Sequence, residues 1–472
     1  MIQELRPYPD YKNSGVPWLG DVPEHWDLLP NRAIFSEVKD RNHPDEEMLS
    51  VTINRGVIKQ KALLENSSKK DSSNTDKSAY KLVCPRDIAY NKMRAWQCAI
   101  GASELRGIIS PAYVVMRLRK DDYNHMYFHH LYRTPQFGKE AERWSYGITS
   151  DMWSLRPEHF KIINTPIPPP EEQAAIVRFL DHADRRIRRF IRAKRRMIEL
   201  LNEQKQAIIH HAVTRGLNPN VRLKPSGVEW LGDVPEHWEV WKLNHIARIG
   251  NGSTPSRANS AYWAGGTIPW LSSGVVNDGT VRHAREHVTD KAIAECHLPW
   301  VKRGSLIMGL IGQGKTRATT ALLDIDATIN QNIAYITPDT RLVLSTYLQQ
   351  ILKSMYAHLR MIGGGDGATE GALSCALLSR IRIVLPPIDE QKTIMKYIGA
   401  EVESIESGLI KIEREIDLVR EYRTRLITDV VTGKLDVRGV AVEAVEEELE
   451  ELLDAEVEEI DDEMGDDEAA EE

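Results

Sequence analysis

Two stretches of the chain carry apolar residues in steps of three and four, the spacing that places one apolar stripe along a helix. Each stretch covers about 45 residues, which is typical of a coiled coil and corresponds to about 68 Å at 1.5 Å per residue. One core helix in each of two unrelated domains is the less favoured alternative, because helices of this length are unusual in ordinary cores. We therefore expect long helices over 172–216 and 390–432, with these apolar positions: Ile176, Leu180, Ala183, Ile187, Phe190, Met197, Leu201 and Ile208, then Ile394, Ile398, Val402, Ile405, Leu409, Ile412, Ile416 and Val419.

Both stretches begin and end with helix signals. A proline-rich segment and two acids precede each of them, in PPPEEQ (168–173) and PPIDEQ (386–391), and a glycine follows at Gly216 and Gly433. The two motifs are 218 residues apart, and so are Thr214 and Thr432. Because the length between motif and threonine is the same in both copies, geometry must constrain it.

A second repeated stretch lies further upstream of each helix than the proline-rich motif. KNSGVPWLGDVPEHW (12–26) returns as KPSGVEWLGDVPEHW (224–238), at an offset of 212 residues. We call these two stretches the Trp segments and interpret them as structural, because Gly-Asp and Val-Pro favour turns and tryptophan anchors them in a core. A direct role in DNA binding is the alternative.

Connectivity then predicts the arrangement. The chain runs variable unit, helix, variable unit, helix, so the helices should be antiparallel and each Trp segment should lie at the end of the other repeat's helix. The expected fold class is α+β, with two α/β units separated by a long antiparallel two-helix coiled coil and related by a pseudo-twofold internal repeat. The corresponding segments are 1–166, 167–217, 218–385, 386–438 and a tail over 439–472.

Each variable unit mixes β-like runs with polar loops. We expect strands over 87–93, 108–118 and 161–170 in the first unit and over 304–311, 328–338 and 379–387 in the second, with helices over 127–137 and 345–359. The loops 66–78, 251–263 and 362–372 are rich in Ser, Asn, Gly, Lys and Arg, which suits contacts with phosphates and base edges but also ordinary solvated turns. Candidate DNA contacts in the first two loops are Lys69, Lys70, Ser253 and Arg257.

Composition narrows the class of protein. No apolar run approaches a membrane span, the N-terminus has no apolar secretory signal, and four widely separated cysteines favour a reducing cytoplasm. The net charge is −8, but Glu443–Glu472 holds 18 acidic residues and no Lys or Arg. Without this tail, 61 basic residues face 69 − 18 = 51 acidic ones, a body of +10 that can attract a polyanion. We expect the tail to be a solvated appendage; a partner-docking or DNA-mimicking segment is the alternative.

The stretch MGLIGQGKTRA (308–318) satisfies the phosphate-loop pattern from Gly309 to Thr316. A nucleotide site also needs a helix that starts at the Lys-Thr pair, whereas RATTALLDIDATINQN suits a turn and a strand better. The corresponding stretch of the first unit, YNKMRAWQ (90–97), has no glycine. We therefore expect this loop to contact DNA rather than a nucleotide, and the candidate residues of the two loops are Gln313, Lys315, Thr316 and Arg317, with Asn91, Lys92 and Arg94 in the first unit.

Other chemistry finds little support. His283 and His287, with Cys296 and His297 downstream, fit no standard zinc spacing, and HExxH, GxSxG and the Asn/Asp-Pro-Pro-aromatic motif of methyltransferases are missing from the sequence. The basic stretch from Arg178 to Arg196 has nine Lys or Arg against two Asp. Arginines usually only solvate a coiled coil, but this excess also suits DNA or an acidic partner, with candidates Arg188, Arg189 and Arg192.

The tandem layout, the PPxxEQ helix starts, TGKLDVRG (432–439) and GSTPSRANSAYWAGGTIPW (252–270) together resemble the specificity subunit of type I restriction–modification systems. The resemblance covers 12–439, and the acidic tail departs from the family pattern. It implies a non-catalytic subunit that recognises a bipartite, asymmetric DNA target through two target-recognition domains.

The resemblance also implies partners: double-stranded DNA, modification (methyltransferase) subunits, two of them by the internal symmetry, and restriction (helicase-nuclease) subunits. S-adenosylmethionine, ATP and magnesium would belong to those subunits, and no cofactor or metal is expected on this chain. Two alternatives stay open: a nucleotide hydrolase that uses 309–316, and a stand-alone DNA-binding or antirestriction protein of the same fold.

Overall fold

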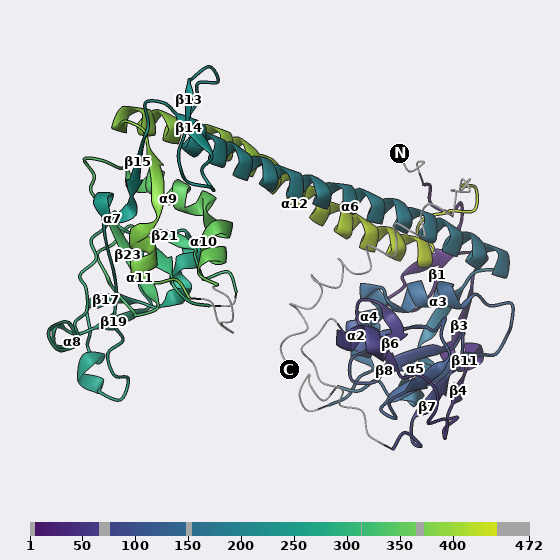
Figure 1. Cartoon of the computed structure of the whole chain (residues 1–472). Coiled ribbons are helices and arrows are strands. Elements are labelled where there is room, and N and C mark those ends of the chain that lie inside the picture. The colour runs from purple at the N-terminus through teal and green to yellow at the C-terminus, as the bar shows by residue number, and fades with distance from the viewer. Residues whose placement is uncertain (1–4, 66–75, 148–152, 313, 365–371, 441–472) are drawn as a thin grey trace. The chain divides into compact units, whose positions relative to one another are not determined.

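The computed structural model describes residues 5–65, 76–147, 153–312, 314–364 and 372–440. The chain forms two compact units, each of which contains sheet and helix and is α+β (Figure 1). Unit 1 comprises residues up to Ala193 together with those from Arg414 onward, and unit 2 comprises Lys194–Glu413. Each long helix therefore contributes one part to each unit. No helix among the described residues has both the length and the apolar character needed to cross a membrane.

Unit 1 is built around a four-stranded antiparallel sheet of order β4-β11-β8-β9. Its aromatic core includes the fully buried side chains of Trp26, Phe35, Tyr127 and Phe160. Its strands are β1 (Tyr11–Asn13), β2 (Asp21–Pro23), β3 (Asp27–Pro30), β4 (Phe35–Val38), β5 (Leu49–Thr52), β6 (Gly56–Lys59), β7 (Lys81–Val83), β8 (Ile88–Asn91), β9 (Ile100–Ala102), β10 (Gly107–Ile109), β11 (Tyr113–Leu118) and β12 (Asn164–Ile167). Its short helices are α1 (Asn31–Ile34), α2 (Gln60–Glu65), α3 (His125–Tyr132), α4 (Pro135–Arg143) and α5 (Pro157–Ile162).

Unit 2 repeats this arrangement with a five-stranded sheet of order β16-β23-β20-β21-β18. Its strands are β13 (Leu223–Pro225), β14 (Asp233–Pro235), β15 (Glu239–Lys242), β16 (Ala247–Asn251), β17 (Ile268–Leu271), β18 (Thr280–Val281), β19 (Glu286–Val288), β20 (Leu306–Gly309), β21 (Thr320–Leu323), β22 (Thr328–Ile329), β23 (Ile333–Pro338) and β24 (Arg382–Leu385). Its short helices are α7 (Leu243–Ile246), α8 (Asp290–Glu295), α9 (Ser345–Ser354), α10 (Tyr356–Ile362) and α11 (Cys375–Arg380).

The two units share a topology although their sequences differ. Strands β4, β11, β8 and β9 correspond in order and pairing to β16, β23, β20 and β21, and β3 pairs β12 as β15 pairs β24. Unit 2 adds a small sheet of β19, β17 and β22, whereas unit 1 adds the hairpin β5–β6. The additions differ, so the shared part is the scaffold.

Several boundaries differ from the sequence expectation. The single helix expected over 127–137 is two helices, because Pro135 starts α4 and Thr134 caps it by accepting from the backbone N–H of Phe137. The helix expected over 345–359 likewise divides into α9 and α10 at Met355. The strand expected over 161–170 is only β12, because a proline at the first helical position starts α5 at Pro157.

The long helices are α6 (Pro170–Arg215) and α12 (Ile388–Val431). In unit 1, Glu172 of α6 lies at the end of α12 and Asp184 pairs with Arg423 at 2.5 Å, so the two helical parts are antiparallel. In unit 2, Gly216 lies beside Glu390, and Lys205 pairs with Glu406 at 3.7 Å, again antiparallel.

The apolar stripe of α6 is incomplete. Ile176, Leu180, Ala183 and Ile187 are buried as expected, but the side chains of Phe190 and Met197 are 41% and 47% exposed. The expectation that these two complete the stripe is wrong. In α12 the expected positions Ile394, Ile398, Ile405, Ile412 and Ile416 are all buried.

The first Trp segment connects the beginning of α6 with the end of α12. Trp26 is fully buried, and its Nε1 donates to Glu172 Oε1 at 2.9 Å. Gly433 follows α12 with φ of 79°, and a Cβ there would lie 2.4 Å from Pro23 Cδ and 3.1 Å from the Trp26 ring. The expected position of the Trp segment beside the second long helix is thus confirmed, and so is its structural role.

The second Trp segment makes most of the equivalent contacts in unit 2, but the Trp238 indole N–H has no hydrogen-bond partner among the described residues. Trp238 is fully buried, Gly216 follows α6 with φ of 74°, and a Cβ there would lie 3.1 Å from the Trp238 ring. His237 Nε2 lies 2.9 Å from Glu390 Oε2, as His25 Nε2 lies 2.8 Å from Glu172 Oε2. The two glutamates are 218 residues apart, like the motifs that contain them, whereas the two glycines are 217 apart, so these contacts match without identical spacing of the glycines.

The glutamine of PPxxEQ also has a defined role in both units. Gln173 accepts from the backbone N–H of Asn124, the N-cap of α3, and donates to Pro168 O. Gln391 accepts from the backbone N–H of Leu344, the N-cap of α9, and donates to Pro386 O. The start of α6 is therefore hydrogen-bonded to the N-cap of α3, and the start of α12 to the N-cap of α9.

Candidate nucleic-acid interface

One end of the central sheet collects polar loops in unit 1. Because β8 and β11 are antiparallel and pair Asn91 with Tyr113, the end of β8, the start of β11 and the start of β9 lie at the same sheet end. The loop 92–99 joins β8 to β9 there. Of the candidates named from the sequence, Asn91, Lys92 and Arg94 lie at this end, while Lys69 and Lys70 lie outside the described residues.

The loop 92–99 is held by its own side chains. Asn91 Oδ1 accepts from the backbone N–H of Met93 at 3.0 Å, and Trp96 Nε1 donates to Met93 O at 3.0 Å. Arg94 Nη1 donates to Gln97 Oε1 at 3.2 Å, and Trp96 lies edge-on to Trp153 at 5.4 Å. The side-chain oxygen of Asn91 thus stabilises the loop, and its side-chain amide nitrogen is the group that can donate to a base.

Sequence reasoning missed a second loop at this end. Arg133, the C-cap of α3, donates to Ile53 O at 2.8 Å and to Ile100 O at 3.2 Å, so it joins the β5–β6 turn to the start of β9. Burial lowers the pKa of Arg133 to about 10. The turn presents Asn54 and Arg55 as exposed side chains. The signal was available, because NRG between two β-branched runs is typical of a hairpin turn.

His129 of α3 explains the glycines beside that turn. A Cβ on Gly56, whose φ is 74°, or on Gly101 would each lie 3.0 Å from the His129 ring. His129 Nδ1 accepts from the backbone N–H of Ala102 at 3.2 Å, and burial lowers the pKa of His129 well below its ordinary value. A neutral imidazole therefore packs between the two loops and fixes their spacing.

The corresponding sheet end of unit 2 also collects polar loops. The backbone N–H of Ser253 donates to Ile329 O at 3.1 Å, and Thr254 Oγ1 donates to Gln331 Oε1 at 2.5 Å. The backbone N–H of Leu310 donates to Asn332 O at 2.9 Å, which joins a third loop, 310–319. The structure therefore brings Ser253, Lys315, Thr316 and Arg317 to one sheet end, whereas Gln313 lies outside the described residues.

The phosphate-loop match has a local explanation. A Cβ on Gly309 would lie 2.2 Å from Thr316 O, so this glycine allows the loop to fold back on the strand that precedes it. After Gly314 the chain makes a turn and continues into β21, and Arg360 of α10 donates to Gly314 O at 2.6 Å. A phosphate loop needs a helix at this point to direct its amides and dipole at the phosphates. The turn and strand expected after Lys315 are confirmed.

Arg257 is engaged within the protein. Its guanidinium lies 3.9 Å from the Trp263 ring centre and 5.2 Å from that of Trp270, and it donates to both carboxylate oxygens of Glu286. These hydrogen bonds raise the pKa of Arg257 and lower that of Glu286. The ion pair with Glu286 engages two of the N–H groups of Arg257, which makes this residue a weaker candidate for a DNA contact.

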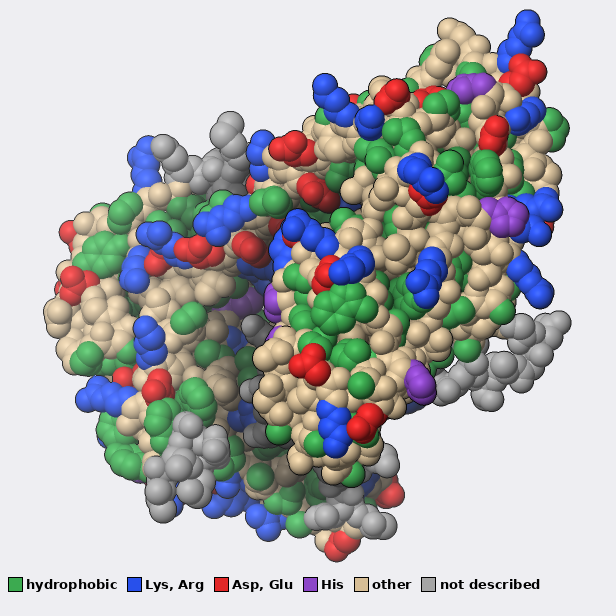
Figure 2. Space-filling view, turned by 90° about the vertical axis from the view of Figure 1, so that its left-hand side faces the viewer, with side chains coloured by type: hydrophobic (Ala, Val, Ile, Leu, Met, Phe, Trp, Pro, Cys, Tyr) green, Lys and Arg blue, Asp and Glu red, His purple; other side chains and the backbone are tan. Residues whose placement is uncertain are grey.

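The arginines of α6 are a separate surface. Arg188 pairs with Asp184 at 2.8 Å, Arg189 is exposed, and Arg192 is partly buried. None of the contacts described for these residues joins them to the sheet-end loops. On the face drawn in Figure 2, basic and acidic side chains are interspersed, so charge alone does not locate the interface.

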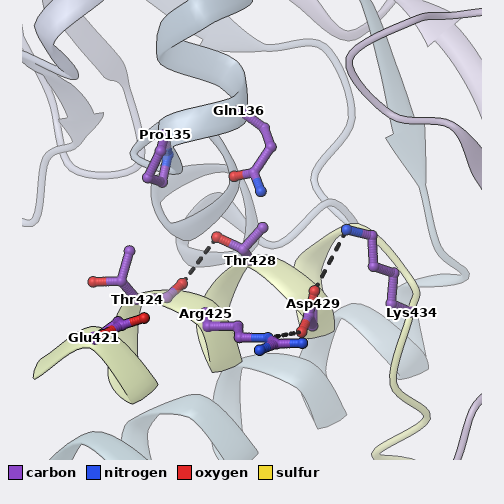
Figure 3. Close-up of a pocket in the computed structure, with 8 residues that line it drawn as sticks. All are labelled: Pro135, Gln136, Glu421, Thr424, Arg425, Thr428, Asp429 and Lys434. Atoms are coloured by element: carbon purple, nitrogen blue, oxygen red, sulfur yellow. Dashed lines mark hydrogen bonds and ion pairs between the residues drawn. The ribbon is translucent and has the colours of Figure 1, made fainter. Parts of the chain in front are cut away.

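The described residues offer little to a small ligand. No group of three His, Cys, Asp or Glu side chains among them could hold a metal ion. A hollow of about 480 Å³ lies between the start of α4 and the last turns of α12, and Figure 3 shows the residues that line it. Arg425 and Lys434 at its edge both pair with Asp429, at 3.6 and 3.5 Å, and the lining is mostly polar, unlike a typical ligand pocket.

Comparison with known proteins identifies the domain type. Residues 235–414 match the family model of the type I restriction modification DNA specificity domain. Over 188 residues, 37% of this chain and 40% of the relative, the sequence is 29% identical to the specificity subunit of the type I restriction enzyme MjaIX of Methanocaldococcus jannaschii. Over 183 residues, 38% and 44%, it is 24% identical to the EcoR124I/EcoR124II specificity subunit of Escherichia coli. The matches span less than two thirds of either relative's length.

Solved structures share the fold. A chain from a structural study of assembly and conformational transition in the type I restriction–modification system has a TM-score of 0.64 at 15% identity, over 88% of this chain and 99% of that chain. The HsdS subunit of Thermoanaerobacter tengcongensis has a TM-score of 0.50 at 16% identity, over 88% and 98%. The sequence of residues 235–414 is thus similar to a type I restriction modification DNA specificity domain, and the chain shares the fold of these solved structures.

Proposed function

We propose that this chain is the DNA-recognition subunit of a type I restriction–modification complex and that each unit recognises one half of a bipartite target. One observation carries the proposal: the same end of the same four-strand sheet bears a basic loop in both units, at 92–99 and at 310–319. Cations and amides on such loops suit phosphates and base edges. Because the two loops differ in sequence, the two half-sites should differ too.

The candidate contacts divide by chemistry. Lys315 is exposed at the loop of unit 2 and suits a phosphate, while Arg55 and Asn54 in unit 1 carry the groups that pair with guanine and adenine in the major groove. Lys92, Arg94, Thr316 and Arg317 lie at the same sheet ends. Lys69, Lys70, Gln313, Arg188, Arg189 and Arg192 stay candidates on sequence grounds alone.

The long helices would act as a spacer between half-sites. Their antiparallel parts and buried apolar positions support a two-helix coiled coil in which the repeats are related by a pseudo-twofold axis. Such symmetry offers two equivalent surfaces, so two modification subunits should bind, one for each half. S-adenosylmethionine would belong to those subunits, and ATP and magnesium to the restriction subunits; the proposal assigns none of them to this chain.

The rival functions find less support. A nucleotide hydrolase would need the helix that the turn after Gly314 replaces. A stand-alone DNA-binding or antirestriction protein would keep the fold but lack catalytic partners. The acidic tail, one means by which it could act, lies outside the described residues from Ala441 onward.

Methylation mapping tests the proposal. In cells that carry the full chain and its modification subunit, long-read sequencing should find one asymmetric motif whose two defined halves are separated by a gap of fixed length. Inserting four residues into each long helix should lengthen the gap by roughly 2 base pairs, because one helical turn rises about 5.4 Å and a base-pair step about 3.4 Å. Altered half-sites with an unaltered gap would contradict the spacer, and no bipartite motif would contradict the function.

A further inference from the structure

The corresponding loops of the two units each expose one large aliphatic side chain at the same place. Met93 is 38% exposed and Ile311 is 42% exposed. Each is the second residue after the last residue of its strand, Asn91 of β8 or Gly309 of β20. The two loop sequences, NKMRAWQC (91–98) and GLIGQGKTRA (309–318), are otherwise dissimilar. A single exposed aliphatic residue needs no explanation, but its recurrence at one position of a duplicated scaffold does.

In unit 1 the backbone holds Met93 outward. Its N–H donates to Asn91 Oδ1 and its carbonyl accepts from Trp96 Nε1, both at 3.0 Å. The backbone carbonyl of Asn91 accepts from the backbone N–H of Arg94 at 3.1 Å. Because both backbone groups of Met93 are engaged inside the loop, the side chain is presented by a rigid turn rather than by a mobile one.

In unit 2 the residue before Ile311 is anchored in the same way. Leu310 is 6% exposed, its N–H donates to Asn332 O, and its carbonyl accepts from the backbone N–H of Leu373, both at 2.9 Å. Gly312 follows with φ of 128°, a conformation that L side chains rarely adopt. Hydrogen bonds therefore hold the chain at Leu310, just before the exposed Ile311, and Gly312 has a positive φ just after it.

Both aliphatic side chains have cationic neighbours. Lys92 and Arg94 flank Met93 directly, and Lys315 and Arg317 follow Ile311 in the same loop. An apolar protein surface is a poor partner for an aliphatic group among cations, since covering the group would also desolvate the charges. A duplex suits both features, because its phosphates can pair with the cations and its base stack can cover the aliphatic group.

We propose that Met93 and Ile311 are wedges, each of which inserts at one base step of its half-site and partly unstacks it. This inference rests on the proposed function. Apolar wedges beside cationic side chains are a known means by which proteins kink DNA, and the unstacking makes binding sensitive to the flexibility of the step. Each unit would thereby select a deformable step next to the bases that its polar side chains contact.

The test uses the full chain assembled with its modification subunit and duplexes that carry the motif found by methylation mapping. Adenines of each half-site are replaced one at a time by 2-aminopurine, whose fluorescence rises when the base unstacks. The variants are Met93→Gln and Ile311→Gln, with Met93→Leu as the conservative form. Matched controls are Ile162→Gln in unit 1 and Leu342→Gln in unit 2, whose side chains are 40% and 38% exposed away from the loops.

The wild-type complex should show a fluorescence rise at one step in each half-site. Met93→Gln should remove the rise in one half only, Ile311→Gln in the other, and each should weaken specific binding about tenfold, roughly 1.4 kcal/mol. The salt dependence of binding should stay unchanged because the phosphate contacts remain. Met93→Leu and both controls should behave as wild type, and a mismatch at the affected step should restore binding by Met93→Gln.

Two results would overturn the wedge. One is an unchanged fluorescence rise and affinity in both Gln variants. The other is a loss of complex assembly without any effect on the DNA, which would make the exposed residues a protein contact. Failure of the proposed function looks different, because the wild-type complex would then bind no bipartite duplex at all.

Discussion

In both units a glutamate near the start of a long helix contacts the Trp segment, but the two glutamates make different numbers of hydrogen bonds. In unit 1, Glu172 is 4% exposed and accepts from Tyr8 at 2.5 Å, from Trp26 at 2.9 Å and from His25 at 2.8 Å. In unit 2, the side chain of Glu390 is 31% exposed and, among the residues that the structure describes, bonds only to His237. Within the same part of the chain, the buried indole nitrogen of Trp238 has no hydrogen-bond partner. Two nearly identical Trp segments thus make different numbers of hydrogen bonds.

The difference comes from the residues that precede each Trp segment. Tyr8 covers Glu172, and the offset of 212 places Asn220 at the corresponding position in unit 2. Burial and the Glu172 carboxylate raise the pKa of Tyr8, so the phenol stays a donor at every ordinary pH. Arg438 lies 4.9 Å above the Tyr8 ring, and Asp436 donates its backbone N–H to Arg6 O. Residues that precede the Trp segment therefore add contacts around Glu172 in unit 1. In unit 2 the contact described for Glu390 comes from the Trp segment itself.

The largest expected effect is on the buried carboxylate. Glu172→Ala leaves the donors of Tyr8 and Trp26 buried and unpaired, so we expect it to lower the free energy of unfolding of unit 1 by about 3–5 kcal/mol. Glu390→Ala removes one exposed pair and should cost unit 2 about 1 kcal/mol or less. Hydrogen exchange, followed separately on peptides of each unit, measures both. Equal losses in the two units would show that the extra hydrogen bonds add nothing.

A smaller difference is expected at the glycines that follow the long helices. Gly433→Ala combines a positive φ with a Cβ that would lie 2.4 Å from Pro23 Cδ, and we expect a cost of about 2–4 kcal/mol. Gly216→Ala has a similar φ, but its closest neighbour is the Trp238 ring at 3.1 Å, so about 1–2 kcal/mol is expected. Thermal unfolding of the two variants checks the order. A larger loss at Gly216 would contradict the tighter contact assigned to unit 1.

The repeats made much of the scaffold predictable from the sequence. Identical spacing between PPxxEQ and threonine indicated that both long helices meet the same partners, and Gly216 and Gly433 do contact the two Trp segments. The β-branched residues after Lys315 and the break at 324–326 predicted a turn and strand, as the structure has it. These features are local or duplicated, so a single sequence contains them.

Other features depend on contacts that the sequence does not display. The exposure of Phe190 follows from the partner surface of α6, which periodicity along one helix cannot specify. The ion pair of Arg257 with Glu286 joins residues 29 apart, and the bonds of Arg133 to the β5–β6 turn span about 80 residues. Long-range pairs of this kind decide which cations are engaged in the fold, and hence which remain available to DNA.

The central claim, that each unit independently recognises half of the target, is tested most directly by replacing residues 27–165 with the corresponding segment of another specificity subunit. Methylation mapping of cells with this hybrid and the modification subunit should find one half-site changed, while the other half-site and the gap are retained. A motif changed in both halves, or in neither, would contradict the account.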